Sequence, residues 1–322
     1  MLLRHRSDRR TLVWAVAMPV VAFLPYFRPG LALWLCPLAC YLALSAGVIA
    51  HNHNHTPTFR DRLGNSLFGN WLSIFYGYPT FAWVPTHNLN HHRMVNKAGD
   101  ATITWRFTNK HNALVAWTYF FVSSWYQSEP IKDYIRKAKE RNPRLYRTII
   151  GQYVFFLGTH VALLALAIAL HGLRTGFKVW GLMFLVPALF ALWTIMFFNY
   201  IQHVHADPWS EHDHSRSFTS PTLNFLLFNN GLHSAHHEMA GAHWSALPGL
   251  HARLVKEINP ELLERSFWWF CLRNYLLALF VPELGTRQVG RAPFDDPALT
   301  TIGAPLTAEV DAFEAGVNAA RA

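Results

Sequence analysis

Residues 199–237 constrain the arrangement of the whole chain. This stretch begins with Asn199-Tyr-Ile-Gln-His203 and ends with Asn230-Gly-Leu-His233-Ser-Ala-His236-His237. It directly follows a long apolar run. Because positions three and four apart share one face of a helix, Asn199 would lie beside His203 and His233 beside His237. Histidines that point to one side are typical of metal sites, so the stretch predicts part of a metal centre next to an apolar segment.

Two earlier histidine clusters match this stretch. His51-Asn-His53-Asn-His55 follows another apolar run, and His87-Asn-Leu-Asn-His91-His92 lies between the two. Helical spacing would place His51 beside His55 and His87 beside His91. Together the clusters predict one metal centre held at a membrane surface. Neutral imidazole binds iron, copper, zinc or nickel, so the spacing alone does not select the metal.

The composition indicates a membrane protein. The 322 residues are 52% hydrophobic and only 15% charged, whereas soluble domains have about 25% charged residues. The net charge of +9 suits an anionic surface or partner. No basic run is interleaved with base-stacking aromatic residues, so we expect no nucleic-acid partner. Cys36, Cys40 and Cys271 give no disulfide framework and are interpreted as reduced apolar side chains.

The N-terminal 50 residues predict one membrane hairpin. Apolar runs at 11–27 and 31–50 are about long enough to cross a bilayer. The arginine-rich N-terminus should stay in the cytosol, so the turn between the runs lies outside. We expect the second helix to continue to His55 and to end before Pro57, since proline cannot continue a helix.

A second hairpin is predicted at 149–170 and 179–198, joined by residues 171–178. The preceding stretch, 129–147, is rich in Lys and Arg and therefore marks the cytosolic side. Four spans of this kind bring every histidine cluster and both termini to the cytosolic face. The apolar segments 63–87 and 113–126 are then interfacial or re-entrant, because one more span would separate the clusters.

The fold predicted is an all-α integral membrane protein, with about four transmembrane helices in two hairpins and a cytosolic histidine-rich helical cap. A further interfacial helix is expected at 266–282. We assign residues 1–290 to a single membrane-embedded domain and residues 291–322 to an Ala- and Pro-rich tail. A metal centre at the membrane surface favours an apolar substrate that enters laterally, and a redox metal beside an acyl chain indicates O2 chemistry at an unactivated C–H bond.

The combined motifs resemble the integral-membrane fatty acid desaturase superfamily, which includes alkane hydroxylase-like enzymes. The similarity covers roughly residues 11–255 and rests on His51-x3-His55, His87-x3-His91-His92, Asn199-x3-His203 and His233-x2-His236-His237. It implies a non-haem centre of two iron ions that uses O2 and a separate electron carrier of the ferredoxin, rubredoxin or cytochrome b5 type with its reductase. The ligands implied are His51, His55, His87, His91, His92, His203, His233, His236 and His237, with Asn199 in the surrounding shell, where a water can link it to a metal.

The motifs point to two branches of this superfamily. The sequence Asn230-Gly-Leu-His233 resembles acyl and sphingolipid desaturases, whereas the second cluster and Asn199-Tyr-Ile-Gln-His203 resemble the alkane hydroxylase branch. We therefore expect desaturation of a lipid acyl chain, with hydroxylation of an alkane, fatty acyl or other lipid substrate as the alternative.

Clustered histidines also occur in structural zinc sites and in metal transporters. A structural zinc site takes four ligands, fewer than the nine clustered histidines. A metal transporter would place ionisable ligands near mid-bilayer, whereas these histidines lie beyond the ends of the predicted spans. The remaining candidates are expected to orient ligands, to support the fold or to lie at the surface: His53, Asp100, His160, His205, His212, His214, Glu238, His243 and His251.

Overall fold

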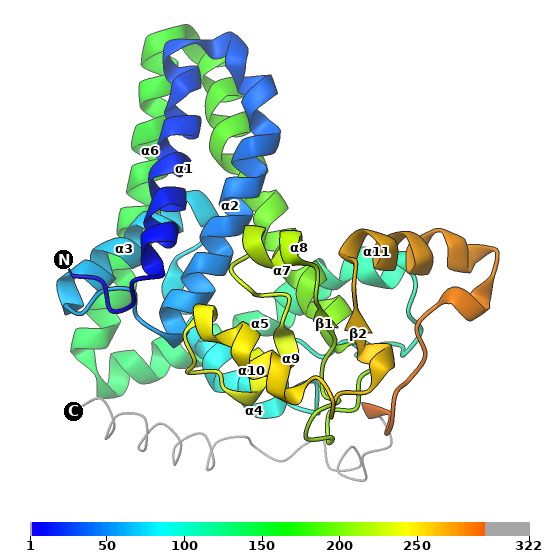
Figure 1. Cartoon of the computed structure of the whole chain (residues 1–322). Helices are drawn as coiled ribbons and strands as arrows, with labels where there is room; N and C mark the ends of the chain where they lie inside the picture. The colour runs from blue at the N-terminus through cyan, green and yellow to red at the C-terminus, as the bar shows by residue number, and fades with distance from the viewer. Residues whose placement is uncertain (1, 294–322) are drawn as a thin grey trace.

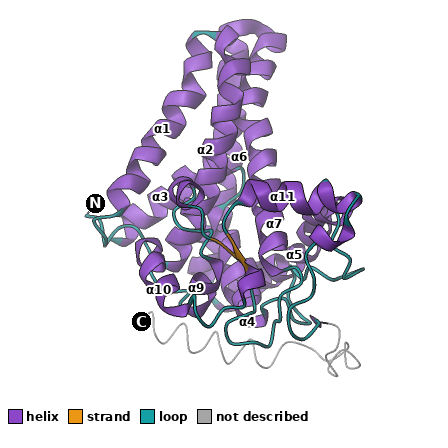
Figure 2. Cartoon of the chain, turned by 45° about the vertical axis from the view of Figure 1, so that its right-hand side comes forward, coloured by secondary structure: helices purple, strands orange, loops and turns teal. Residues whose placement is uncertain are grey.

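Long apolar helices stand side by side and form the upper part of the molecule (Figure 1). They are α1 (Asp8–Phe27), α2 (Ala32–His55), α6 (Pro143–Trp180) and α7 (Val186–His203). The computed structural model describes residues 2–293, and shorter helices and loops gather around the lower end of these columns (Figure 2).

Three helical stretches are long and apolar enough to cross a membrane: Asp8–Phe27, Pro29–His55 and Pro143–His203. The third has 61 residues, which at 1.5 Å per residue is about 90 Å, three times the thickness of a hydrocarbon core. Its backbone leaves the helical region at Gly172, where φ is 76°. The chain reverses there, as the position of Gly176 shows: a Cβ on Gly176 would lie 2.5 Å from the backbone nitrogen of Ile168, in the preceding part of the helix. The predicted linker 171–178 is therefore mostly helical, and the turn is confined to Gly172.

The first hairpin follows the prediction closely. A 3-10 turn, η1 (Pro29–Leu31), joins α1 to α2, and α2 ends at His55 with an extended residue, Thr56, before Pro57. Leu3 forms a β-bridge with Phe59, and the amide of Arg4 donates to the carbonyl oxygen of Thr58. The N-terminal residues thus lie at the same end of the bundle as His55.

Close packing of α2 on α7 brings the histidine-bearing ends together. A Cβ on Gly47 would lie 2.3 Å from Cδ1 of Ile195 and 2.7 Å from the ring of Tyr76. Only glycine allows this approach without displacing a neighbour. Since α2 ends at His55 and α7 ends at His203, the contact places both histidine clusters at one end of the bundle.

Two helices surround the base of the bundle where the sequence predicted interfacial segments. The first, α3 (Arg62–Tyr76), is capped by Asp61, which accepts from the amide of Gly64, and it ends at Gly77 with φ 89°. The second, α5 (Ala113–Arg141), is capped by Asn112. Both expose large apolar side chains, among them Leu63, Leu67, Leu114 and Trp117. The basic stretch 129–147 forms the end of α5 and the start of α6, with Asn142 capping α6.

The remaining elements form the cap below the bundle. Its helices are the π-helix η3 (Val84–His91), α4 (His92–Met94), α8 (Pro221–Leu226), α9 (His233–Glu238), α10 (Leu247–Leu254) and α11 (Phe267–Tyr275). A second π-helix, η4 (Gly181–Leu185), precedes α7. Short 3-10 turns are η2 (Thr80–Ala82), η5 (Trp244–Ala246), η6 (Pro260–Leu262), η7 (Leu277–Leu279) and η8 (Pro282–Leu284).

The described residues are mostly helical, as predicted, but the cap also contains a small sheet that the all-α prediction did not include. β1 (Ser217–Phe218) pairs in parallel with β2 (Leu263–Glu264). Strands of two residues are too short to leave the alternating pattern by which strands are predicted. Helix α11 is shorter than the interfacial helix predicted at 266–282, which continues as turns. Residues 294–322, most of the predicted tail, lie outside the described residues.

Candidate metal centre

The nine clustered histidines come together as two groups that can each hold a metal ion. Within each group the ligand atoms lie within 4.8 Å of one another. One group contains His51, His55, His87, His92 and His236; the other contains His91, His203, His233 and His237. Each group draws on α2 or α7, on the 84–94 segment and on α9, so neither exists until these elements have packed together.

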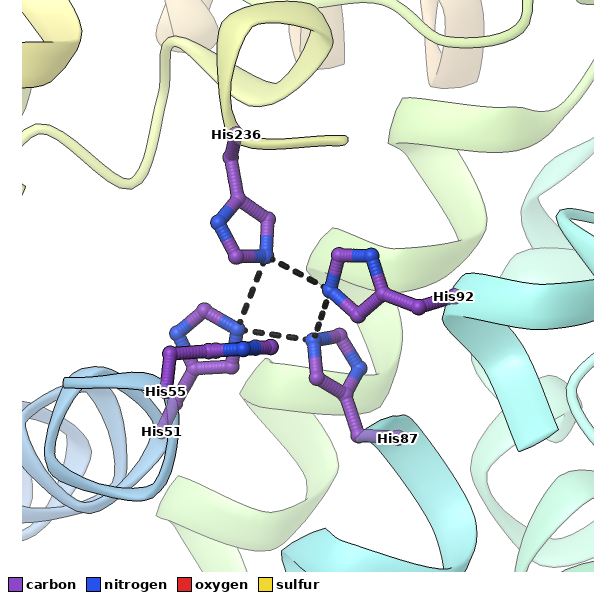
Figure 3. A group of neighbouring side chains, drawn as sticks. All are labelled: His51, His55, His87, His92 and His236. Carbon is purple, nitrogen blue, oxygen red and sulfur yellow. Dashed lines mark hydrogen bonds between the residues drawn. The ribbon is translucent and has the colours of Figure 1, made fainter. Parts of the chain in front are cut away.

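In the five-histidine group, four Nε2 atoms form a closed ring (Figure 3). The successive separations are 2.8 Å from His51 to His87, 3.0 Å from His87 to His92, 2.9 Å from His92 to His236 and 3.1 Å from His236 to His51. His55 lies against this ring, with its ring centroid 4.7 Å from that of His51. Its buried Nε2 atom has no hydrogen-bond partner.

These separations match the edge of a metal coordination shell. A metal–imidazole bond is about 2.0–2.1 Å long, so two nitrogens bound at right angles lie about 3.0 Å apart and two bound tetrahedrally about 3.4 Å apart. The observed 2.8–3.1 Å therefore fits ligands at right angles, as in a five- or six-coordinate ion. A closed four-histidine structural zinc site would show the longer spacing.

The four-histidine group has the same spacing. The Nε2 atom of His203 lies 3.1 Å from that of His91 and 2.9 Å from that of His233. The Nε2 atom of His237 lies 3.1 Å from that of His233. The two groups adjoin, because the rings of His91 and His87 stack with centroids 5.2 Å apart. Two ions held here would be close neighbours.

The other ring nitrogens fix which tautomer several of these histidines adopt. Nδ1 of His91 lies 2.8 Å from a carboxylate oxygen of Asp100, and Nδ1 of His203 lies 3.1 Å from the carbonyl oxygen of His214. Nδ1 of His51 lies 3.1 Å from the side-chain oxygen of Asn52. An oxygen acceptor keeps the proton on Nδ1 and leaves Nε2 with a free lone pair. Lone pairs that face one another at 3 Å repel unless a cation lies between them.

The π-helix η3 determines which of the two metal groups each histidine of the second cluster joins. In η3 each turn has more residues than in an α-helix, so the side chain beside position i is that at i+5. His87 and His92 thus share one group, and His91 enters the other. The α-helical pairings predicted from spacing hold for His51 with His55 and for the final pair, since α2 and α9 are regular.

Asp100 lies beside the four-histidine group and contacts one of its members, His91. It is buried, and it accepts from the hydroxyl of Thr102 at 2.6 Å and from the amide of Asn96 at 2.8 Å as well as from His91. Burial alone would raise its pKa, but the His91 charge and these hydrogen bonds lower the pKa to about 2. Asp100 is therefore an anion at neutral pH, and it orients the ring of His91 by accepting a hydrogen bond at Nδ1.

Burial keeps the histidines of the cap neutral. It lowers the pKa of each well below the ordinary value, and the charge that a neighbouring imidazolium would carry lowers it further; this applies to His87, His92, His233, His236 and His237. Neutral imidazole is the form that binds a metal. The site is therefore ready to bind cations without first losing protons.

The other candidate residues lie outside both groups. The side-chain amide of Asn199 donates to the Tyr119 hydroxyl at 2.7 Å. His53 contacts Thr58 and the Asn65 carbonyl oxygen, and His205 contacts Thr286 and the Asn109 carbonyl oxygen. His160 lies among aromatic rings, His212 lies near Glu211, and the ring of His214 lies 5.4 Å from that of His237 at a tilt of 59°. Glu238 is exposed, His243 pairs with Asp8, and His251 is half-buried.

Sequence reasoning missed the polar residues that surround the groups. Thr102, Gln202 and Asn230 line the cavity beside the histidines, together with Asn199. Tyr119 donates to the carbonyl oxygen of Thr102, behind His91. Gln202 and Asn230 lie within the two motifs quoted from residues 199–237, but neither was assigned a role. Thr102 and Tyr119 lie outside the histidine clusters, and only the short distance between Asp100 and Thr102 in the sequence gave a signal.

One cavity is lined by the histidines, and a second cavity adjoins it. The inner cavity has a volume of about 60 Å³ and is bounded by His51, His87, His91 and His233 and by apolar residues of α2 and α7. The outer cavity has a volume of about 500 Å³ and is mainly apolar. Both are lined by Trp83, Thr86, Gln127, Ile195 and Met196, so these five residues form the waist between them.

Apolar helices with histidine groups at one end define a membrane protein with a candidate metal centre. The Fatty acid desaturase family model matches residues 28–270, about three quarters of the chain, and the chain belongs to this family. The family consists of oxidoreductases, which agrees with a histidine cluster able to bind a redox metal. Comparisons with curated proteins and with solved structures found no match.

Proposed function

We propose that the chain is an O2-dependent, di-iron fatty acyl desaturase of the membrane. The observation that carries this proposal is the pair of imidazole groups at the end of an apolar cavity. Nine histidines exceed what one ion accepts, and two adjoining groups accommodate two. Iron fits the near right-angle spacing of the nitrogens and is the metal that supports O2 chemistry in this family.

The proposed ligands follow the two groups. One iron is held by His51, His55, His87, His92 and His236, and the other by His91, His203, His233 and His237. Asn199 lies on the cavity wall between α7 and α5 and acts through a water or through Tyr119. Two such ions supply the oxidising power, derived from O2, that side chains lack. The protein positions the chain, excludes water and keeps the imidazoles neutral.

The proposed membrane arrangement has four spans. Pro143–His203 crosses twice, because the chain reverses at Gly172. The N-terminal residues and the ends of α2 and α7 then share one side, which the arginines before residue 11 assign to the cytosol. Electrons come from a separate ferredoxin, rubredoxin or cytochrome b5 type carrier with its reductase.

Desaturation and hydroxylation share their inputs and differ in their products. Each consumes one O2, two electrons and two protons. Desaturation removes two hydrogens from the chain and releases two waters, whereas hydroxylation leaves one oxygen atom in the product and releases one water. The choice depends on differences of a few kcal/mol in barrier height, since about 1.4 kcal/mol is tenfold in rate. We favour desaturation because the Asn230-Gly-Leu-His233 motif resembles acyl desaturases.

Isotopes distinguish the two reactions. A host expressing the chain is fed a perdeuterated saturated fatty acid under labelled O2, beside a host expressing His237→Ala. Desaturation predicts an alkene that has lost two deuterium atoms and carries no label from O2. A main product that retains labelled oxygen would instead establish hydroxylation. If the His237→Ala host gives the same product, the chain is not its source.

A further inference from the structure

The small inner cavity limits how much of a substrate can pass the metal centre. At about 60 Å³ it has room for about four to six waters, at 10–15 Å³ for each, and hence for only a few carbon atoms. The outer cavity is about eight times larger. If the end of a long chain stays inside the inner cavity, only the few carbons next to that end can lie beside the histidines.

The inner cavity ends in buried apolar side chains. Leu44, Val48 and His51 lie on one face of α2, and Leu44 is about 10 Å from His51 along the helix axis at 1.5 Å per residue. Leu44 and Val48 are buried, as are Phe198 and Leu227 on the facing side. These buried apolar side chains form the part of the cavity wall that lies inside the bundle, and we call this wall the floor of the inner cavity.

The waist between the cavities is held by a contact between side chains of α5 and α7. The side-chain amide of Gln127 donates to the sulfur of Met196 at 3.4 Å. Both residues line both cavities. A methionine has three rotatable bonds and adapts to different shapes, so the waist can adjust to a thin methylene chain.

The outer cavity has a polar rim. Ser124, Ser128 and Lys132 line the outer cavity, and Lys132 is exposed, where it also pairs with Glu129. The apolar wall of the outer cavity includes Phe120 and Ile135. An amphiphile with one hydrocarbon chain would keep its head group at this polar rim and direct its methyl end inwards.

From these features we infer that the substrate is a single-chain amphiphile that enters methyl end first, and that the oxidised carbon is counted from that methyl end. The inference rests on the proposed function and adds a rule for which carbon of the chain is oxidised. The floor at Leu44 and Val48 stops the methyl end, and the few carbons that fit between the floor and the histidines set which C–H bond is presented. Gln127 and Met196 select for an unbranched chain.

Product analysis tests the counting rule. Saturated fatty acids of different chain length are supplied, and the double bond or hydroxyl is located by mass spectrometry. The position should be constant when counted from the methyl end and should lie within a few carbons of it. A position that is constant when counted from the carboxyl end would overturn the inference.

A matched pair of variants tests the floor. Leu44→Ala should deepen the inner cavity and shift the oxidised position inwards by one or two carbons. Leu192→Ala is the control, because Leu192 lines only the outer cavity, and it should leave the position unchanged. An unchanged product from Leu44→Ala at full iron content, or equal shifts in both variants, would contradict the assignment.

Photo-labelling separates this inference from the proposed reaction, because it requires no turnover. A fatty acid with a diazirine at its methyl end should label peptides containing Val48 or Leu227 in the purified wild-type protein. With Met196→Trp, labelling should move to peptides containing Phe120 or Ile135, with iron content unchanged. Methyl-end labelling confined to the outer cavity of the wild type would overturn the inference even if the enzyme is active. Correct labelling without any oxidised product would instead count against the proposed function.

Discussion

The Nε2 atoms of His91 and His203 lie 3.1 Å apart, although the Nδ1 atom of each ring faces an oxygen acceptor. Asp100 holds the Nδ1 proton of His91, and the carbonyl oxygen of His214 holds that of His203. Neither Nε2 then carries a proton for a hydrogen bond between the rings. Two buried lone pairs at this distance are stabilised only by a shared cation, so the contact is best explained as one edge of a metal site.

The two groups predict different responses to the loss of one histidine. His203→Ala leaves three imidazoles in its group, so iron content should fall from two to about one per chain. His55→Ala is the matched comparison, because four imidazoles remain in its group. It should retain close to two irons. Elemental analysis of purified protein measures both, and equal losses would contradict the grouping.

Asp100 should contribute to metal affinity without touching the metal. Asp100→Asn removes the negative charge but keeps the size of the side chain. Loss of a partner that orients a metal-binding histidine reduces metal affinity about 10–100-fold. The measurement is iron retained against a graded series of chelator concentrations. The conservative change Glu238→Gln, at an exposed position close to the ligands in sequence, should leave the curve unchanged. Wild-type retention in Asp100→Asn would argue against this role.

The four-span arrangement predicts opposite labelling at two exposed positions. With Cys36, Cys40 and Cys271 replaced, a single cysteine at Gly172 should react with an impermeant reagent added to intact cells. One at Ser66, on α3, should react only after the membrane is opened. Reaction at both positions in intact cells would mean that the α3 region crosses the membrane.

The purified chain should not oxidise NADH or NADPH by itself. Its three cysteines form no iron–sulfur or rubredoxin pattern, and no Gly-rich flavin or nicotinamide fingerprint follows a strand. Turnover should appear only when a reductase and a carrier are added, and O2 uptake measures it. Strong NADH-driven turnover by the chain alone would refute this prediction.

His111 should make the stability of the protein dependent on pH. It lies between Tyr275 and Thr286, at 2.8 Å and 2.5 Å, and burial, followed by the charge of Arg216, lowers its pKa well below 6.5. As pH falls below about 6.5, the unfolded chain gains a proton at this residue that the folded chain does not, so stability decreases. Each unit of pKa difference corresponds to about 1.4 kcal/mol.

The variant His111→Gln isolates this effect. It should be less stable than the wild type at pH 7.5, because the ring contacts are lost, but it should lose less stability between pH 7.5 and pH 5. Melting temperatures of the iron-loaded protein in detergent provide the comparison. A pH dependence as steep as that of the wild type would exclude His111 as a source.

The sequence by itself determined the apolar helices, the ends of α1 and α2 and the nine histidines that converge. Apolar run lengths, Pro57 and regular helical spacing are local properties, and they predicted that His51 lies beside His55 and His233 beside His237. Membership of the desaturase family also followed from the order and spacing of the clusters, which the family match over residues 28–270 confirms.

Only the tertiary structure decided how the histidines divide and what lies around them. The π-helix η3 places His87 and His92 in one group. The sequence did not predict this pairing, because a local change of helical pitch leaves no distinct period in the sequence. The contact of Asp100 with His91 depends on how the 95–104 loop folds back, and the waist between Gln127 and Met196 joins helices 69 residues apart in sequence. Such contacts depend on packing between distant segments, which no local pattern encodes.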